Sequence, residues 1–191
     1  FQLIMDHYRT FRRLGLNVDF VHKNTEDFSG YKLISVVGAI HISSDLISRI
    51  ANSMATLVFG PRTGARVGNM QIPKNLPPQI NLVKSRILRV ETLPSNVSLE
   101  IDPLGRAGRY IEIIKLDNNA SPYLKLKNGQ VIATKEESGV IYLASMIDQK
   151  GLTAFYQKLF KEIKLDFLLM PDGVRRRSTE IEEFWFNYNN K

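Results

Sequence analysis

The chain of 191 residues contains no cysteine. This absence excludes a disulfide framework, a thiolate metal site and a cysteine nucleophile, and with the last it excludes glutamine-amidotransferase chemistry whatever the fold. The sequence also has no apolar stretch long enough to cross a bilayer, and its first residues lack a basic region followed by an apolar core. These absences predict a cytoplasmic protein with no membrane partner.

Histidine is nearly as scarce, with three residues, His7, His22 and His41. They are isolated from one another, and neither a His-x-x-x-His nor a His-Glu-x-x-His spacing occurs. Metal sites built on histidine need such clustered ligands, so the sequence predicts no metal site. His41 follows a predicted buried strand, where a partly buried, hydrogen-bonded histidine is the favoured interpretation.

Basic residues are abundant but dispersed. The net charge of +7 and the pI near 9.6 would suit a polyanion, yet Lys and Arg are interspersed with acids. The densest runs, residues 175–177 and 12–13, lie in no recognisable nucleic-acid motif, so solvated surface is the favoured interpretation. No nucleic-acid partner is expected, and a basic nucleic-acid-binding module stays a distant third hypothesis.

Hydrophobic periodicity in the first third of the chain predicts an α/β fold. Apolar residues at helical spacing predict a first helix that ends at Gly15, and Ser44 is the predicted N-cap of a second helix carrying Leu46, Ile47, Ile50 and Met54 on one face. Predicted strands occupy residues 17–21, 33–37 and 56–59, and the strand at 33–37 is predicted to be fully buried. This order implies right-handed crossovers and a doubly wound parallel sheet.

The strand at residues 56–59 ends in a Gly-rich turn. Loops at the carboxyl ends of parallel strands often carry function, although a plain strand-to-loop turn is the commoner case. No Gly-Lys-Ser/Thr follows, so a phosphate loop is disfavoured, and no cofactor is expected. Residues 68–78, with Pro73, Pro77 and Pro78, predict a long loop of the kind that is often interfacial.

The middle of the chain is rich in predicted strands, at least partly antiparallel. They cover residues 86–93, 109–116, 123–127, 130–134 and 140–144, and Asn128-Gly129 predicts a type I′ hairpin. Leu152 to Ile163 then marks a closing helix. Residues 174–178 and 184–186 are compatible with a hairpin of a different β module, which predicts an α/β domain at 1–170 and the start of a C-terminal β domain at 171–191.

Several segments, in order, resemble one family. They are residues 8–19 (YRTFRRLGLNVD), 57–64 (LVFGPRTG), 138–143 (SGVIYL) and 170–174 (MPDGV). Together they are similar to the trimerisation domain, the middle domain, of glycoside hydrolase family 42 β-galactosidases. The resemblance covers nearly the whole chain. Where the family has a Gly-rich helix end, this sequence has residues 52–55 and lacks the usual left-handed C-cap residue, for which Asn52 is only a partial substitute. Lys84 replaces a further family glycine.

The resemblance implies a flavodoxin-like or class I glutamine-amidotransferase-like fold in a polypeptide that also carries a catalytic barrel. Because the chain starts at Phe1, we expect a piece of that polypeptide, with the family's first strand missing and a sheet edge left unpaired. The family hydrolyses terminal β-D-galactosides with two barrel glutamates, so no catalytic residue and no hydrolysis are expected of this chain alone. Its predicted partners are itself, as a homotrimer, and the catalytic barrel.

Acidic and aromatic pairs in the chain have ordinary interpretations. Glu136-Glu137 and Glu182-Glu183 are predicted to be solvated surface, because adjacent side chains diverge on a strand or helix. Trp185, with the aromatic residues around it, is predicted to be core of the β module in preference to a sugar-stacking platform.

The candidate functional segment is the loop of residues 60–78, predicted to form a subunit interface or a wall of a neighbouring subunit's active-site entrance. Its candidate residues are Gly60, Pro61, Arg62, Thr63, Gly64 and Arg66. The alternative is a small-ligand-binding flavodoxin-like domain that uses the loops after Val37 and Phe59.

Overall fold

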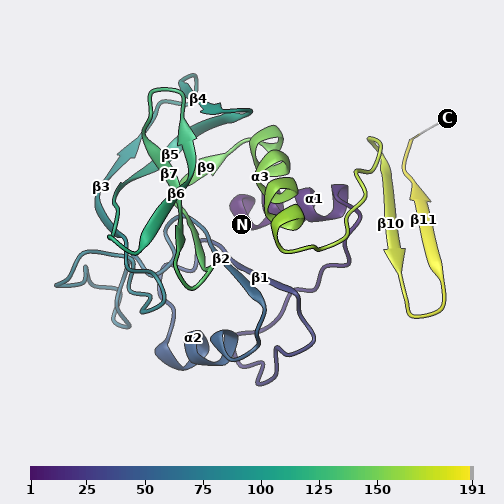
Figure 1. Cartoon of the computed structure of the whole chain (residues 1–191), viewed down its shortest axis with the longest axis horizontal. Coiled ribbons are helices and arrows are strands. Elements are labelled where there is room, and N and C mark those ends of the chain that lie inside the picture. Colours follow the sequence, from purple (N-terminus) through teal and green to yellow (C-terminus); the bar gives the residue numbers. More distant parts are fainter. Residues whose placement is uncertain (190–191) are drawn as a thin grey trace.

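The computed structural model describes residues 1–189, and within them the chain forms three helices and eleven strands (Figure 1). The helices are α1 (Gln2–Arg13), α2 (Ser44–Ala51) and α3 (Gln149–Glu162). The strands are β1 (Leu33–Val36), β2 (Thr56–Phe59), β3 (Arg86–Thr92), β4 (Ser98–Asp102), β5 (Arg106–Lys115), β6 (Ala120–Leu126), β7 (Val131–Glu136), β8 (Ile141–Leu143), β9 (Ser145–Ile147), β10 (Val174–Ser178) and β11 (Glu183–Asn187).

Nine strands form one sheet in the order β1-β2-β8-β7-β6-β4-β5-β3, with β9 also paired to β5. The strands β1, β2 and β8 run parallel, with Val58 opposite Ile141 and Phe59 opposite Tyr142, and the other pairings are antiparallel. The predicted α/β class and the antiparallel middle are thus confirmed. Sequence analysis missed β4 and β9.

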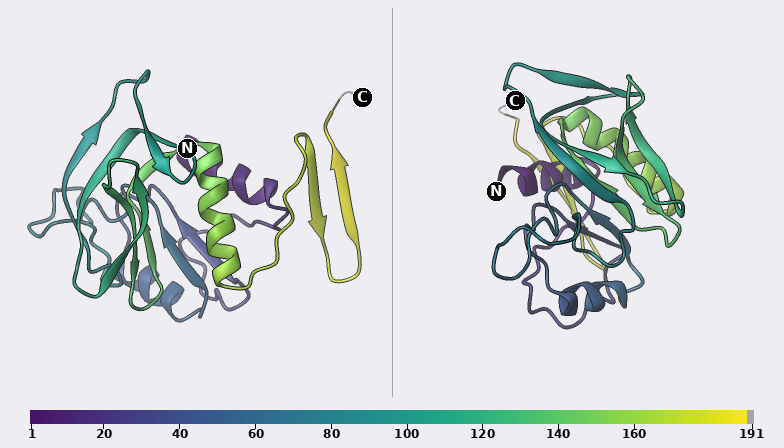
Figure 2. Two further views of the ribbon diagram at one scale, coloured as in Figure 1. Left: turned by 45° about the horizontal axis from the view of Figure 1, so that its top comes forward. Right: turned by 90° about the vertical axis from the view of Figure 1, so that its left-hand side faces the viewer.

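Helices cover both faces of the parallel strands, as in a doubly wound sheet. Val58 joins a core with α1 and α3, whereas Leu57 and Phe59 join a second core with α2. This division follows from the two-residue period of a strand, which sends alternate side chains to opposite faces. In Figure 2, α3 stands between the sheet and the C-terminal hairpin. Each fully buried large apolar side chain contributes roughly 1.5–3 kcal/mol to folding.

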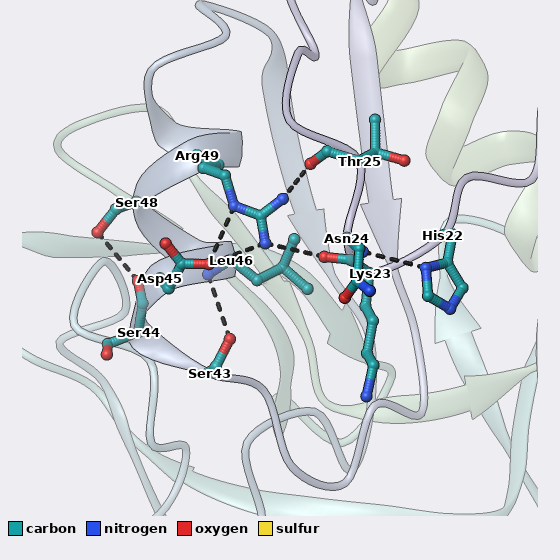
Figure 3. A network of polar contacts seen from close by, with 10 residues as sticks. All are labelled: His22, Lys23, Asn24, Thr25, Ser43, Ser44, Asp45, Leu46, Ser48 and Arg49. Carbon is teal, nitrogen blue, oxygen red and sulfur yellow. Dashed lines mark hydrogen bonds and ion pairs between the residues drawn. The ribbon is translucent and has the colours of Figure 1, made fainter.

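The helix α2 begins one residue earlier than its predicted cap implies. Ser43, not Ser44, is the N-cap, and its hydroxyl accepts a hydrogen bond of 3.2 Å from the Leu46 N–H. Arg49 then ties the helix to the preceding loop, because its guanidinium donates to the carbonyl oxygens of residues 23 and 25 and pairs with Asp45 at 2.9 Å (Figure 3).

The end of α2 differs from the prediction. The helix stops at Ala51, so Met54 falls outside the apolar face and is 93% exposed. Asn52 keeps right-handed helical angles, and Met54, with φ of 60°, takes the left-handed conformation predicted for Asn52. The predictions for both residues were therefore wrong, because the left-handed residue comes two positions later than predicted, at Met54.

Three other local predictions were wrong. Residues 17–21 form no strand in the described chain, and the Asn17 side chain instead donates to the Ser178 carbonyl at 2.6 Å.

The strand β1 lies at the end of the sheet, so it is half-buried and not fully buried. At the Asn128-Gly129 turn only Gly129 has positive φ, and its N–H donates to the Leu126 carbonyl at 2.9 Å. A type I′ turn requires positive φ at both central residues.

The strands β10 and β11 form the predicted antiparallel hairpin, separate from the main sheet. It lies beside α1, where the Arg12 guanidinium donates to the Arg176 carbonyl at 2.8 Å. Trp185 is 53% exposed, and its aromatic neighbours are exposed as well. They are therefore not core residues within the described chain, because a two-stranded sheet has no second layer to cover them. The proposed domain start at residue 171 stays a prediction, and residues 190 and 191 lie outside the described residues.

Candidate functional site

The turn after β2 is bound tightly to the loop after β1. The Gly60 N–H donates to the Val36 carbonyl at 2.7 Å, and the Gly64 and Arg66 N–H groups donate at 2.9 Å to the carbonyls of residues 39 and 40. The buried Thr63 hydroxyl adds a bond of 3.1 Å to the Val36 carbonyl. The carboxyl ends of two neighbouring parallel strands thus form one hydrogen-bonded unit.

Glycine is required in this unit. A Cβ at Gly60 would overlap the Val37 side chain, and Gly64 has φ of +69° with its Cα facing the backbone N of Gln79. The Gln79 N–H in turn donates to the Gly64 carbonyl at 2.7 Å. The turn is therefore fixed against both the loop before it and the loop after it.

Arg62 lies at the apex of the turn. It has φ of 67°, a left-handed conformation that costs a residue with a Cβ ~1 kcal/mol. Its side chain is exposed, and the guanidinium carbon lies 5.6 Å from the centre of the Tyr110 ring. Sharp turns after a parallel strand present functional side chains in many α/β proteins.

A buried carboxylate, Glu112 of β5, supports the turn from below. One of its oxygens accepts hydrogen bonds of 3.0 Å from the Arg62 N–H and from the Tyr110 hydroxyl, and the other accepts one of 2.8 Å from the Tyr142 hydroxyl. Burial raises the pKa of Glu112 to about 7, against the opposing effect of these three donors. Sequence analysis missed Glu112, although a glutamate between the isoleucines of an apolar strand was a signal for a buried, bonded carboxylate.

The loop that continues from the turn has fixed ends and an exposed apolar tip. Its end is anchored by the bond from the Ile87 N–H to the Pro77 carbonyl, 2.7 Å, and by the buried Ile80. Between these anchors Met70, Ile72 and Leu76 are exposed, Ile72 by 75%. We call these three residues the apolar tip. As predicted, no helix or strand forms in residues 68–78.

The histidines occupy unrelated places. His41 is exposed beside Gly68, so the predicted partial burial was wrong, because the loop after β1 turns outward there. His7 is buried, with its Nδ1 2.7 Å from the Tyr156 hydroxyl, and burial lowers its pKa to about 4. Among residues 1–189 no group of three or more His, Asp or Glu side chains is arranged to hold a metal ion.

The acidic and basic pairs are less uniform than predicted. Glu137, Glu182 and Glu183 are exposed, but Glu136 is buried, and its carboxylate accepts a bond of 3.1 Å from the Lys84 N–H. The prediction for Glu136 was wrong because a loop distant in sequence covers it. The middle arginine of residues 175–177 is half-buried and pairs with Glu183 at 3.1 Å, so this run is partly structural.

Two surface hollows lie away from the loops after Val37 and Phe59. One is lined by residues of the β4–β5 turn and the start of α3, and the other by residues 118–121 and 135–137. The two loops themselves pack directly on each other through the hydrogen bonds above. The two loops at the carboxyl edge are therefore bonded to each other and do not line either hollow, which gives no support to the alternative of a small-ligand site.

The geometry thus defines an α/β domain that presents a rigid surface loop. A family model described as "Beta-galactosidase trimerisation domain" matches residues 1–166. The chain belongs to this family. It is therefore a non-catalytic domain of the kind found within β-galactosidases.

Relatives and solved structures agree with this assignment. The β-galactosidase BgaA of a Thermus species is 30% identical over 190 residues, which are 97% of this chain and 29% of the relative, and a Thermus thermophilus β-galactosidase is 29% identical with the same coverage. The chain thus spans less than a third of either relative. The β-galactosidase structure from Marinomonas ef1 superposes with a TM-score of 0.88 at 31% identity, over 96% of this chain and 28% of that one.

A second structure, the β-galactosidase of Rahnella sp. R3, shows the same fold. Its TM-score is 0.84 at 22% identity, over 98% of this chain and 32% of that one. No helix within residues 1–189 is long and apolar enough to cross a membrane.

Proposed function

We propose that this chain is the assembly domain of a cytoplasmic glycoside hydrolase family 42 β-galactosidase and holds three copies of a catalytic barrel together. The observation that carries the proposal is the match of the trimerisation-domain model to residues 1–166. The barrel of the same polypeptide would hydrolyse terminal β-D-galactosides, consistent with the names of both Thermus relatives. Trimers close when one surface of each subunit contacts a different surface of the next.

Within the domain, we assign the interface to residues 60–78. The turn that begins this loop is fixed by hydrogen bonds to its neighbours, and a rigid surface loses little conformational entropy on binding. The apolar tip of the loop exposes side chains whose burial against another subunit would favour association. The alternative for the same loop is that it forms a wall of the active-site entrance of a neighbouring barrel.

We thus assign assembly to this chain and hydrolysis to the barrel of the same polypeptide. In sedimentation equilibrium, the whole polypeptide that carries this chain should have the mass of three subunits. It should hydrolyse a chromogenic β-galactoside, whereas residues 1–191 alone, shown to be folded by circular dichroism, should not. A monomeric whole polypeptide would contradict the assembly role. Turnover by the folded chain alone, with the whole enzyme excluded as a contaminant, would contradict the division of labour.

A further inference from the structure

Arg62 has an unusual backbone conformation and a charged side chain without an ion pair among residues 1–189. Five non-glycine residues have positive φ in the described chain, namely Met54, Arg62, Met70, Arg109 and Lys164. Of these, Arg62 alone has its backbone N–H bonded to a buried carboxylate, Glu112, at 3.0 Å. A conformation that disfavours side chains with a Cβ persists only where the surroundings enforce it, and such residues concentrate at functional sites.

The backbone of the turn explains the conformation but not the residue type. Glycine would adopt the same φ without strain, and glycines already stand at positions 60 and 64 of this turn. An arginine therefore keeps a strained position that a glycine would occupy more easily. The geometry of the turn therefore does not require the arginine side chain.

The guanidinium of Arg62 has no hydrogen bond and no ion pair with any of residues 1–189. The positive charge of Arg62 lowers the pKa of Glu112 against the larger effect of burial, but the two side chains form no ion pair, and the carboxylate accepts the Arg62 N–H and two tyrosine hydroxyls instead. The guanidinium lies instead over the Tyr110 ring, which restrains it by a cation–π contact. Its five N–H donors thus remain free in a preorganised position.

Arg66 adds a second cation to the same place. Burial and the neighbouring Glu112 raise the pKa of Tyr110, and the positive charges of Arg62 and Arg66 both oppose that rise. The Arg66 backbone is fixed at 2.9 Å to the Ile40 carbonyl, and its side chain has no ion pair among residues 1–189. A guanidinium fork recognises carboxylates in two-point geometry.

We propose that Arg62, assisted by Arg66, binds a carboxylate side chain of a second copy of this chain in the assembled protein. The proposal rests on the assembly role proposed above. A ring of copies joins two different surfaces, so a carboxylate from elsewhere on the chain can reach this turn in the neighbouring copy. Exposed carboxylates without an ion pair among residues 1–189 are available for this contact, including Glu26, Glu137, Glu180 and Glu182.

The strain at Arg62 permits a test in which folding and assembly move in opposite directions. In the whole polypeptide, Arg62→Gly should leave the denaturation midpoint of the dissociated subunit unchanged or raised, because glycine accepts a φ of 67° freely. The same variant should raise the dissociation constant of the trimer at least tenfold in sedimentation equilibrium. A variant that is merely misfolded would lower the midpoint as well.

Lys164→Gly is the matched control. Lys164 has φ of 54° and an exposed side chain, so this change removes one positive charge and one strained residue far from the turn. It should leave the dissociation constant within twofold of the unchanged protein. Arg62→Lys keeps the charge but loses the fork, and should give an intermediate dissociation constant.

The salt dependence of the trimer dissociation constant tests whether the contact is a pair of opposite charges. The dissociation constant of the unchanged trimer should rise with sodium chloride concentration, and more steeply than that of Arg62→Gly. Equal salt dependence, or a dissociation constant for Arg62→Gly that matches the Lys164→Gly control, would overturn the inference while the trimer itself remains. Lower galactoside turnover with an unchanged trimer would place the carboxylate on the barrel and would also overturn it. An unchanged polypeptide that is monomeric would instead refute the assembly role.

Discussion

The two buried titratable side chains with the clearest environments lie on opposite faces of the sheet. His7 lies in the face covered by α1 and α3, packed edge-on against Phe11 and Tyr156. Its Nδ1 contacts the Tyr156 hydroxyl, while its Nε2 has no hydrogen-bond partner among residues 1–189. Glu112 lies toward the other face and has three donors.

The comparison shows two different roles for a buried polar side chain: His7 fills space, whereas Glu112 holds another residue in position. An incompletely bonded imidazole among aromatic rings serves mainly to fill space between two helices. A carboxylate with every oxygen bonded, one of them to the N–H of a strained surface residue, holds that surface residue in place. Buried polar networks of the second kind are costly to break, because each donor left behind loses its partner.

Removal of the Glu112 carboxylate is expected to have the largest effect. Glu112→Ala leaves the Arg62 N–H and two tyrosine hydroxyls without acceptors and should lower the free energy of unfolding by about 4 kcal/mol in urea titrations. Glu112→Gln, which keeps one acceptor oxygen, should cost only about 1 kcal/mol. Equal losses in the two variants would show that the carboxylate does not organise the turn.

The pH dependence of stability should have opposite signs for the two residues. The folded pKa of His7 is lowered from 6.5 to about 4, so the unfolded chain binds the extra proton between these values, and His7 favours folding more as the pH rises from 4 to 6.5. The folded pKa of Glu112 is raised from 4.5 to about 7, so its contribution is present below 4.5 and is lost as the pH rises to 7. Each change amounts to about 3 kcal/mol.

Variants separate these two contributions. Relative to His7→Gln, the unchanged chain should gain about 3 kcal/mol of unfolding free energy between pH 4 and 6.5. Relative to Glu112→Gln, it should lose about 3 kcal/mol between pH 4.5 and 7. Urea titrations at half-unit pH intervals measure both differences. A flat difference curve for either variant would contradict the assigned environment of that residue.

Local sequence signals predicted much of the fold. The 3.6-residue period predicted α1 and α3, and the β-branched run at residues 56–59 predicted β2, because these patterns report which side an element buries. The strands β4 and β9 escaped prediction. The first is polar and short, the second has three residues, and both exist because the long strand β5 offers them hydrogen bonds.

The candidate site was predictable only in part. Gly60 and Pro61 marked the turn, since glycine and proline set local backbone geometry. The residue that supports the turn, Glu112, lies 50 positions beyond Arg62, and no local pattern joins them. The same limit applies to Glu136, whose partner Lys84 is 52 residues away. The burial of a polar side chain depends on which distant segment covers it.

The most direct test of the account concerns the apolar tip of the loop. In the whole polypeptide, the double change Ile72→Asp and Leu76→Asp would place two charges in the proposed interface. The control, Met54→Asp, changes an apolar side chain outside this loop that is more exposed than Ile72 or Leu76, at 93%. Sedimentation equilibrium at micromolar concentration should show monomers for the double variant and trimers for the control and the unchanged protein. Trimers of full mass in the double variant, with the same dissociation constant, would contradict the claim that this loop holds the subunits together.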